Sequence, residues 1–379
     1  MKKMLMVASV ASMIDQFNME NIKILHELGY EVHVAANFIT GNTCSNQRLH
    51  DFENELKEIS VISHQVDFSR NIISIIENYK AYRQILRLIN TNQYDFIHCH
   101  SPIGGVCARL AAHKTGVKVI YTAHGFHFYK CAPIKNWILF YPIERYCSKY
   151  TNILITINRE DYTIAQKFKA KKIINIPGIG IDTEKFKIDQ RLKYMLRKQL
   201  DIPENATVIL SVGELSERKN HRIVIKALAE LKNSNIIYII CGQGKLDKYL
   251  KDLALEQNIS LKLFGFIQDM TKVYAAADIF VFPSVQEGLP VALMEAMSAG
   301  LPIICSDIRG NRDLIKHGLG GYLVETNNYK DYIHSIEKLL SNNTVAKSMK
   351  EYNQNIINNY DIKKVNQIMR DIYQQISLQ

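Results

Sequence analysis

Short apolar runs alternate with segments of helical period along the whole chain. Such an alternation predicts repeated β-α-β units and parallel sheets. In the first half the expected strands are Lys3–Ser9, Glu31–Ala36, Ser60–Gln65, Phe96–Cys99, Lys118–Thr122, Ile153–Ile157 and Lys172–Ile176. In the second half they are Ala206–Val212, Ile236–Cys241, Leu261–Phe264, Ile279–Phe282, Pro302–Cys305 and Gly321–Val324.

The segment Asn71–Asn90 shows the helical period clearly. Its apolar residues recur at a spacing that places them on one stripe of a helix. The stripe consists of Ile72, Ile75, Ile76, Tyr79, Tyr82, Ile85, Leu86 and Ile89. We therefore expect a helix over this segment, with its stripe buried in the core.

The strand pattern stops and restarts near the middle of the chain, after Pro177-Gly178-Ile179-Gly180. A chain of 379 residues is too long for one ordinary core and suits two domains. We expect an α/β fold with two Rossmann-like domains, residues 1–180 and 181–360, that face a central cleft. Ligands of such open sheets lie beyond the carboxyl ends of the strands.

Composition indicates a folded globular protein, with 47% hydrophobic and 22% charged residues. No stretch approaches the roughly 20 apolar residues of a membrane span. The seven cysteines include no C-x-x-C pair, which favours a reduced, cytosolic compartment. The segment Met1–Met13 resembles a short secretory signal, but its residues also suit a first strand.

Positive charge is concentrated in residues 70–175, where 16 Lys and Arg stand against 5 Asp and Glu, a net charge of +11 within a chain total of +10. This field would attract phosphates, nucleic acid or an anionic membrane surface. Charge alone does not choose among them, and solvated helix faces would explain it as well.

The first candidate loop, Val212–Asn220, follows a strand and opens a helix. Gly213 permits the turn, and Arg218 and Lys219 bring two positive charges to the helix entrance. Helix dipole and backbone N–H groups already favour anions there, so the loop suits a phosphate group. The alternative interpretation is a solvated basic turn.

Two further loops follow strands of the second half. Gly242 and Gly244, in Cys241–Gly244, allow close approach of the backbone to a ligand. Phe266, in Phe264–Ile267, offers an aromatic face or main-chain groups to a nucleobase. Each of these signals is weak alone.

The fourth loop is the most specific. Glu287, Gly288 and Leu289 precede Pro290, which suits a first helical residue, so Glu295 falls on the helix beyond. Eight residues span about 12 Å along a helix, close to the separation of sugar and ribose in a nucleoside diphosphate sugar. Each carboxylate could accept hydroxyl hydrogen bonds at one end of such a ligand. A pair of surface glutamates is the alternative.

The motif E-G-L-P-x-x-L-x-E-A-M-x-x-G-x-P-x-I, which begins at Glu287, resembles the signature of family 4 of the retaining GT-B glycosyltransferases. Val212–Lys219 and Tyr274–Asp278 are similar to other family segments. The resemblance implies that Glu287 contacts the donor sugar and that Glu295 binds the ribose. Arg218 and Lys219 would neutralise the diphosphate.

The first half resembles the acceptor domain of the same family, and His124 matches a histidine close to the donor sugar. The segment Tyr121–Tyr150 looks most like enzymes that extend lipid-linked precursors of exopolysaccharide or capsule. In this architecture a C-terminal helix, residues 361–379, packs back on the first domain. The chain departs from the family in Ser9–Asp15, which lacks a phosphate-binding Gly-Gly pair, and in Glu214, which stands where many members have arginine.

We therefore expect retaining transfer of a hexose or N-acetylhexosamine from a UDP sugar to a polyprenyl-diphosphate-linked saccharide. No cofactor or metal is expected, because no D-x-D motif or metal-ligand spacing occurs. The expected location is cytoplasmic, peripheral on the anionic inner membrane surface, with no nucleic-acid partner. The alternatives are a nucleotide-sugar 2-epimerase-like isomerase and a non-catalytic nucleotide-sugar or nucleic-acid binding protein.

Overall fold

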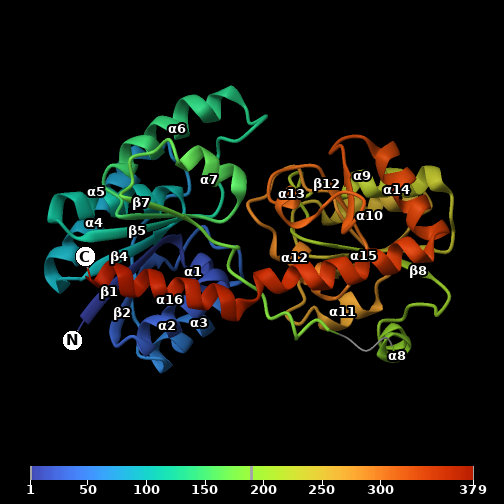
Figure 1. Ribbon diagram of the computed structural model, residues 1–379, viewed down its shortest axis with the longest axis horizontal. Helices are drawn as coiled ribbons and strands as arrows, with labels where there is room; N and C mark the ends of the chain where they lie inside the picture. Colours follow the sequence, from blue (N-terminus) through green and yellow to red (C-terminus); the bar gives the residue numbers. More distant parts are fainter. Residues whose placement is uncertain (1, 188–190, 379) are drawn as a thin grey trace. The chain divides into compact units, whose positions relative to one another are not determined.

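The computed structural model describes residues 2–187 and 191–378. Met1 and Gln379, the ends of two predicted ranges, lie outside the described residues. The chain forms two compact units (Figure 1), one from Met1–Ile179 with Lys364–Gln379 and the other from Gly180–Lys363. The division between Ile179 and Gly180 lies one residue from the predicted boundary.

Unit 1 is built on a parallel sheet in the order β3-β2-β1-β4-β5-β6-β7. Its strands are β1 (Lys2–Val10), β2 (Tyr30–Asn37), β3 (Ile62–Gln65), β4 (Phe96–His100), β5 (Lys118–Ala123), β6 (Ile153–Thr156) and β7 (Lys172–Asn175). Its helices are α1 (Ala11–Phe17), α2 (Met19–Glu27), α3 (Asn46–Glu58), α4 (Ile75–Asn92), α5 (Pro102–Thr115), α6 (Ile134–Ser148) and α7 (Arg159–Ala165).

Unit 2 has a parallel sheet in the order β10-β9-β8-β11-β12-β13. Its strands are β8 (Thr207–Val212), β9 (Ile236–Cys241), β10 (Ser260–Gly265), β11 (Ile279–Phe282), β12 (Ile303–Ser306) and β13 (Gly321–Val324). Its helices are α8 (Arg191–Gln199), α9 (His221–Leu231), α10 (Asp247–Glu256), α11 (Thr271–Ala276), α12 (Val291–Ser298), α13 (Asn311–Leu314), α14 (Tyr329–Ser341) and α15 (Asn343–Ile356), followed by the 3₁₀ turn η1 (Ile357–Tyr360). The last helix, α16 (Ile362–Leu378), begins at the end of unit 2 and belongs to unit 1 from Lys364 onward.

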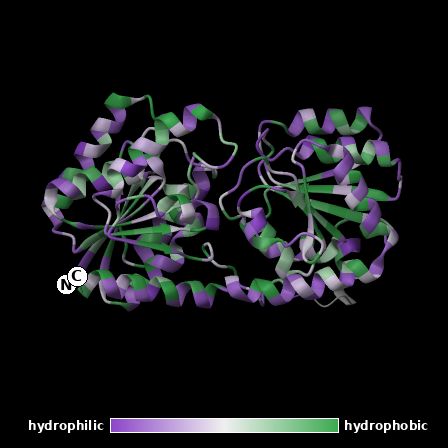
Figure 2. Cartoon of the chain, turned by 45° about the horizontal axis from the view of Figure 1, so that its top comes forward, coloured by the Kyte–Doolittle hydropathy of each residue, from purple (hydrophilic) through white to green (hydrophobic). Residues whose placement is uncertain are grey.

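Every predicted strand is present, and the α/β fold of two Rossmann-like units is confirmed. The central strands are largely apolar (Figure 2), because helices cover both faces of each sheet, although β4 also carries His98 and His100. In β9, for example, every residue from Ile236 to Cys241 is buried. The apolar runs of the sequence therefore correspond to doubly covered strands.

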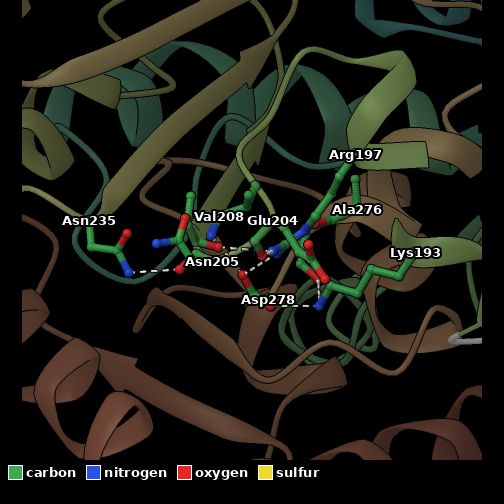
Figure 3. A network of polar contacts seen from close by, with 10 residues as sticks. Lys193, Arg197, Glu204, Asn205, Val208, Asn235, Ala276 and Asp278 are labelled. Atoms are coloured by element: carbon green, nitrogen blue, oxygen red, sulfur yellow. Dashed lines mark hydrogen bonds and ion pairs between the residues drawn. The ribbon is translucent and has the colours of Figure 1, made fainter. Parts of the chain in front are cut away.

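A polar network attaches α8 to the amino ends of β8 and β11 (Figure 3). Asp278 accepts hydrogen bonds from Lys193 at 2.5 Å, from Arg197 at 2.6 Å and from the Val208 amide at 2.7 Å. A cavity of about 720 Å³ lies beside this network. Both are at the edge of the sheet opposite to the candidate loops, so we assign this network a structural role.

The prediction for Asn71–Asn90 is partly wrong. The helix α4 begins at Ile75, and only the second half of its stripe, with Ile85 and Ile89, is buried. Ile75 and Ile76 are 75% and 85% exposed. The helical period is real, but within residues 2–187 and 191–378 no helix or strand covers Ile75 and Ile76.

The last helix, α16, packs on unit 1 from Lys364 onward. Its Tyr373 hydroxyl contacts Nδ1 of His98 at 2.9 Å, and its Ile376 carbonyl accepts a hydrogen bond from Lys118 at 3.2 Å. Tyr373 also stacks on Phe96. Buried aromatic and polar contacts thus hold this helix against the sheet of unit 1.

Candidate active site

The candidate loops of unit 2 meet at the point where the order of its sheet reverses. β8 and β11 are neighbours, but the chain proceeds from β8 toward β9 and β10 and from β11 toward β12 and β13. The loops after β8 and β11 therefore diverge and leave a crevice, which is where open α/β sheets bind ligands. Val212–Asn220 and Pro283–Pro290 are these two loops.

Main-chain hydrogen bonds join the loops to one another. The Gly213 amide donates to the Cys241 carbonyl at 2.9 Å, and the Gly242 amide donates to the Gly265 carbonyl at 2.7 Å. The loops after β8, β9 and β10 are thus bonded in sequence. The structure brings all four predicted loops of this half to one edge.

Close backbone approach explains two of the glycines. A Cβ atom on Gly242 would lie 1.9 Å from the Gly213 carbonyl oxygen, and a Cβ atom on Gly244 would lie 2.4 Å from the Leu215 carbonyl oxygen. A Cβ on Gly213 would meet the Lys219 side chain at 2.8 Å. These glycines pack the loops together, which is a different use from the predicted approach to a ligand.

Arg218, Lys219 and Glu287 form one charged cluster. Oε1 of Glu287 accepts hydrogen bonds from Lys219 at 2.7 Å and from Arg218 at 3.0 Å. The Val285 amide donates to the Arg218 carbonyl at 2.9 Å, so the two loops are joined beside the cluster. With Glu214, which lies 3.9 Å from Arg218, the cluster holds two cations and two carboxylates, and its two basic side chains can contact an anionic ligand at the crevice.

The three side chains differ in their access to solvent. Lys219 and Glu287 are each 11% exposed, whereas Arg218 is 43% exposed. Burial lowers the pKa of Lys219, and the neighbouring Glu287 carboxylate opposes this change. Lys219 also lies 4.6 Å from the centre of the Phe282 ring. Lys219 is therefore held in place, and Arg218 is the more exposed of the two cations.

Two residues that the sequence analysis missed support the Glu287 loop. Arg309 donates from Nε to the Glu287 carbonyl at 3.1 Å. A Cβ atom on Gly310 would lie 2.2 Å from the Gly288 carbonyl oxygen, so only glycine fits there. Both follow β12, and no periodic pattern or motif of the sequence pointed to them.

Glu295 lies on α12, as predicted, but Pro290 precedes the helix and Val291 is its first residue. The helical estimate of 12 Å between the two glutamates therefore applies only to the segment from Val291. Burial raises the pKa of Glu295 to about 7, while a hydrogen bond from Tyr274 opposes this effect. The Tyr274 hydroxyl donates to Glu295 Oε2 at 3.0 Å, a contact that no pattern in the sequence predicted.

The remaining predicted residues of this half occupy different environments. Leu289 and Pro290 are buried and Gly288 is partly buried, so they shape the Glu287 loop. Phe266 follows β10 and is exposed, so its ring is accessible to a ligand.

In unit 1, His124 follows β5 and contacts a second histidine. Its Nε2 lies 3.1 Å from Nδ1 of His100, which ends β4. Burial lowers the pKa of His124 to about 4 and lowers that of His100 well below its usual range. Both rings are therefore neutral near pH 7. His100 has a ring nitrogen, Nε2, without a partner among the described residues.

The predicted loop Ser9–Asp15 is not a loop. β1 extends to Val10 and α1 begins at Ala11. Ser9 uses its hydroxyl within unit 1, where it accepts a hydrogen bond from the Gly104 amide at 2.9 Å.

Three further observations bear on the sequence predictions. Within residues 2–187 and 191–378, no group of three or more His, Cys, Asp or Glu side chains is placed to hold a metal ion. In the same part of the chain, no helix has the length and apolar character needed to cross a membrane. The seven cysteines are free thiols, and Cys131 is the exposed one among them.

Comparisons with known proteins agree with this architecture. Residues 3–158 match the family described as "Glycosyl transferase 4-like", and residues 194–356 match "Glycosyl transferases group 1". The putative glycosyltransferase EpsD of Bacillus subtilis is 33% identical over 98% of this chain and 96% of that protein.

A second relative is the UDP-Gal:alpha-D-GlcNAc-diphosphoundecaprenol alpha-1,3-galactosyltransferase of Escherichia coli. It is 32% identical over 79% of this chain and 80% of its own length. Among solved structures, HepE from Anabaena in complex with UDP superposes with a TM-score of 0.79 at 18% identity, covering 99% of this chain and all of HepE. That likeness confirms the fold.

Proposed function

Since the chain belongs to family 4 of the GT-B glycosyltransferases, we propose that it transfers a sugar from UDP to a lipid-linked saccharide, with retention of configuration, in surface polysaccharide biosynthesis. The transferred sugar is a hexose or an N-acetylhexosamine. The acceptor saccharide is carried on a polyprenyl diphosphate.

The observation that carries the proposal is the cluster of Arg218, Lys219 and Glu287 at the switch point of unit 2. Negative charge grows on the diphosphate as the bond between the sugar and its phosphate oxygen breaks. Cations that are already positioned where this charge develops stabilise the transition state more than the ground state. Lys219, which is buried and held by Glu287, meets this requirement.

Glu287 has a second role in the proposal. Both of its hydrogen bonds from the cluster end on Oε1, and within the described residues no hydrogen bond reaches Oε2. This oxygen can accept a hydrogen bond from a hydroxyl of the donor sugar and so orient the ring. The acceptor hydroxyl then attacks the anomeric carbon on the face that the diphosphate leaves. Its proton passes to an oxygen of the departing diphosphate, so the reaction requires no covalent bond to Glu287.

We assign Glu295 to the ribose of the donor, since its carboxyl lies in the same half on α12 and is partly accessible. His124 keeps the position beside the transferred sugar that the family resemblance implies. A neutral imidazole there can donate or accept a hydrogen bond without adding charge. No metal is needed in this scheme, because side chains supply the positive charge.

Two comparisons support the choice of substrates. The name of the Escherichia coli relative includes a UDP sugar and a diphosphoundecaprenol acceptor, and the HepE structure contains UDP. The net charge of +11 over residues 70–175 suits an anionic membrane surface, where such an acceptor resides. We therefore propose a cytoplasmic protein that associates peripherally with the inner face of the membrane.

The test is a thermal-shift and hydrolysis screen against UDP, GDP and ADP sugars, with a Glu295→Ala variant alongside. We expect stabilisation and slow hydrolysis with UDP sugars, both reduced in the variant, and no loss of activity in the presence of a chelator. Stabilisation by another nucleotide family would refute the donor assignment. Conversion of the donor into an isomeric sugar nucleotide without acceptor would favour the epimerase-like alternative.

A further inference from the structure

A groove of about 700 Å³ lies on unit 1 between α4, α5 and α6, and its lining is mainly apolar. This volume falls within the usual range for small-molecule sites. The apolar lining includes Ile75, Tyr79, Ile103, Val106, Leu110 and Phe140. The groove explains why the first half of the α4 stripe is exposed, since Ile75 and Tyr79 form one of its walls.

The groove follows the length of α5. Ile103, Val106, Leu110 and Lys114 recur along one side of this helix and all line the groove. The eleven residue steps from Ile103 to Lys114 correspond to about 16 Å of α-helix. The site is therefore elongated, which favours a chain over a compact ring system.

The polar side chains of the lining, which include Tyr79, Tyr82, His113 and Lys114, stand in a mainly apolar surface. The Glu144 carboxylate is bonded within unit 1, to Arg109 at 2.8 Å and to the Tyr121 hydroxyl at 3.0 Å. A nucleotide or saccharide would leave most of its hydrogen bonds unmade in such a groove, whereas a hydrocarbon chain needs none.

Charge and position favour a chain that carries a phosphate. The segment from Arg70 to Lys149 holds 11 Lys and Arg against 3 Asp and Glu, and Lys114 lies in the lining at one end of the groove. At the opposite end, Pro102 begins α5 two residues after His100, which contacts His124. A chain along α5 would thus place its phosphate-bearing end close to the candidate active-site histidine and its hydrocarbon end beside Lys114, where this lysine can contact anionic headgroups of the surrounding bilayer.

We propose that this groove binds the polyisoprenyl chain of the lipid-linked acceptor. The inference rests on the proposed function for the identity of the acceptor, but its test requires no sugar transfer. A chain that leaves the bilayer for the groove gains by covering apolar lining that water would otherwise contact, and covering roughly 60 Å² of such surface would change affinity by about tenfold, so occupancy of the groove should be measurable.

The experiment is flotation of the whole protein with three kinds of phosphatidylcholine vesicle: plain, with phosphatidic acid, and with undecaprenyl phosphate at the same mole fraction. Val106→Phe fills the groove. Ile138→Phe places the same ring on α6 at a residue that is 71% exposed and outside the lining, and is the matched control. Thermal melting checks that both variants fold.

We expect wild type to bind undecaprenyl phosphate vesicles about tenfold more tightly than phosphatidic acid vesicles. Val106→Phe should bind the two kinds of anionic vesicle equally, and Ile138→Phe should keep the tenfold preference for undecaprenyl phosphate. Equal binding to both anionic vesicles would show that the occupant is the bilayer itself and would overturn the proposal, as would an unchanged preference in a folded Val106→Phe variant. Failure of the UDP-sugar screen would leave this result unaffected, so the two proposals fail separately.

Discussion

Replacement of Glu295 by glutamine should make the unliganded protein more stable at alkaline pH. Burial raises the pKa of this carboxyl from its usual 4.5 to about 7. Between these two values the unfolded chain releases the proton while the folded chain retains it, so wild-type stability falls as pH rises through this window. The difference corresponds to roughly 3 kcal/mol above pH 7, an upper limit because solvent reaches part of the side chain.

The assay is urea denaturation of wild type and E295Q at intervals between pH 5 and pH 8. We expect the gap in unfolding free energy between E295Q and wild type to grow by up to about 3 kcal/mol in favour of the variant between pH 5 and pH 8. Glu351→Gln, at an exposed position of α15, is the control and should show no such trend. A gap that is constant across pH would refute the burial argument.

Ionisation of the Glu295 carboxyl should also accompany the binding of UDP. Ribose hydroxyls donate to the ionised form, so UDP binding near pH 7 should release a proton from Glu295. Calorimetric titration in two buffers of different ionisation enthalpy measures this release. The E295Q variant should bind UDP about 10- to 100-fold more weakly, from loss of a hydrogen bond to a charged group, and release no proton. Persistence of the release in E295Q would assign it to another group and contradict the ribose role.

Three further predictions follow from the geometry of the two units. Lys219→Ala should lower kcat about 10²- to 10³-fold in a steady-state transfer assay, because one fixed cation at the diphosphate is lost; an unchanged kcat would exclude this role. Gly242→Ala should cost about 3 kcal/mol in urea denaturation, since its Cβ would lie 1.9 Å from the Gly213 carbonyl oxygen, and a loss below 1 kcal/mol would mean that the loops readily separate. His100→Ala should lower kcat roughly tenfold or more with little change in donor KM, because His124 loses its partner; an equal effect on donor KM would instead indicate a general disturbance of the fold.

The strands and the edge that carries the site could be predicted from the sequence for a simple physical reason. A parallel sheet covered on both faces needs continuous apolar strands, and such runs are visible in one sequence. Since the carboxyl ends of parallel strands share one edge, residues that follow different strands must come together. The common location of Gly213, Gly242 and Glu287 follows from this rule alone.

Side-chain pairing across that edge could not be predicted. Glu287 bonds Lys219, which is 68 residues away, and Arg309 supports the same loop from the end of another strand. Such contacts depend on the lengths and hydrogen bonds of loops, which leave no period in the sequence. The prediction that Glu287 contacts the donor sugar did not include the two cations, Arg218 and Lys219, that bond one of its oxygens.

The stripe of α4 shows a second limit of pattern analysis. A helical period identifies the apolar face of a helix but carries no information about what covers it. Over the second half of α4 the cover is α5, whose buried Ala108, Ala111 and Ala112 are small enough for close packing. Over the first half, the groove separates Ile75 from α5 and α6, and Ile75 and Ile76 remain exposed. An apolar stripe that continues past its covering element is unusual on a soluble protein and typically marks a surface that a ligand or partner covers. The exposed part of the stripe is thus the feature of unit 1 in which expectation and structure differ most, and it borders the groove that we assign to the acceptor chain.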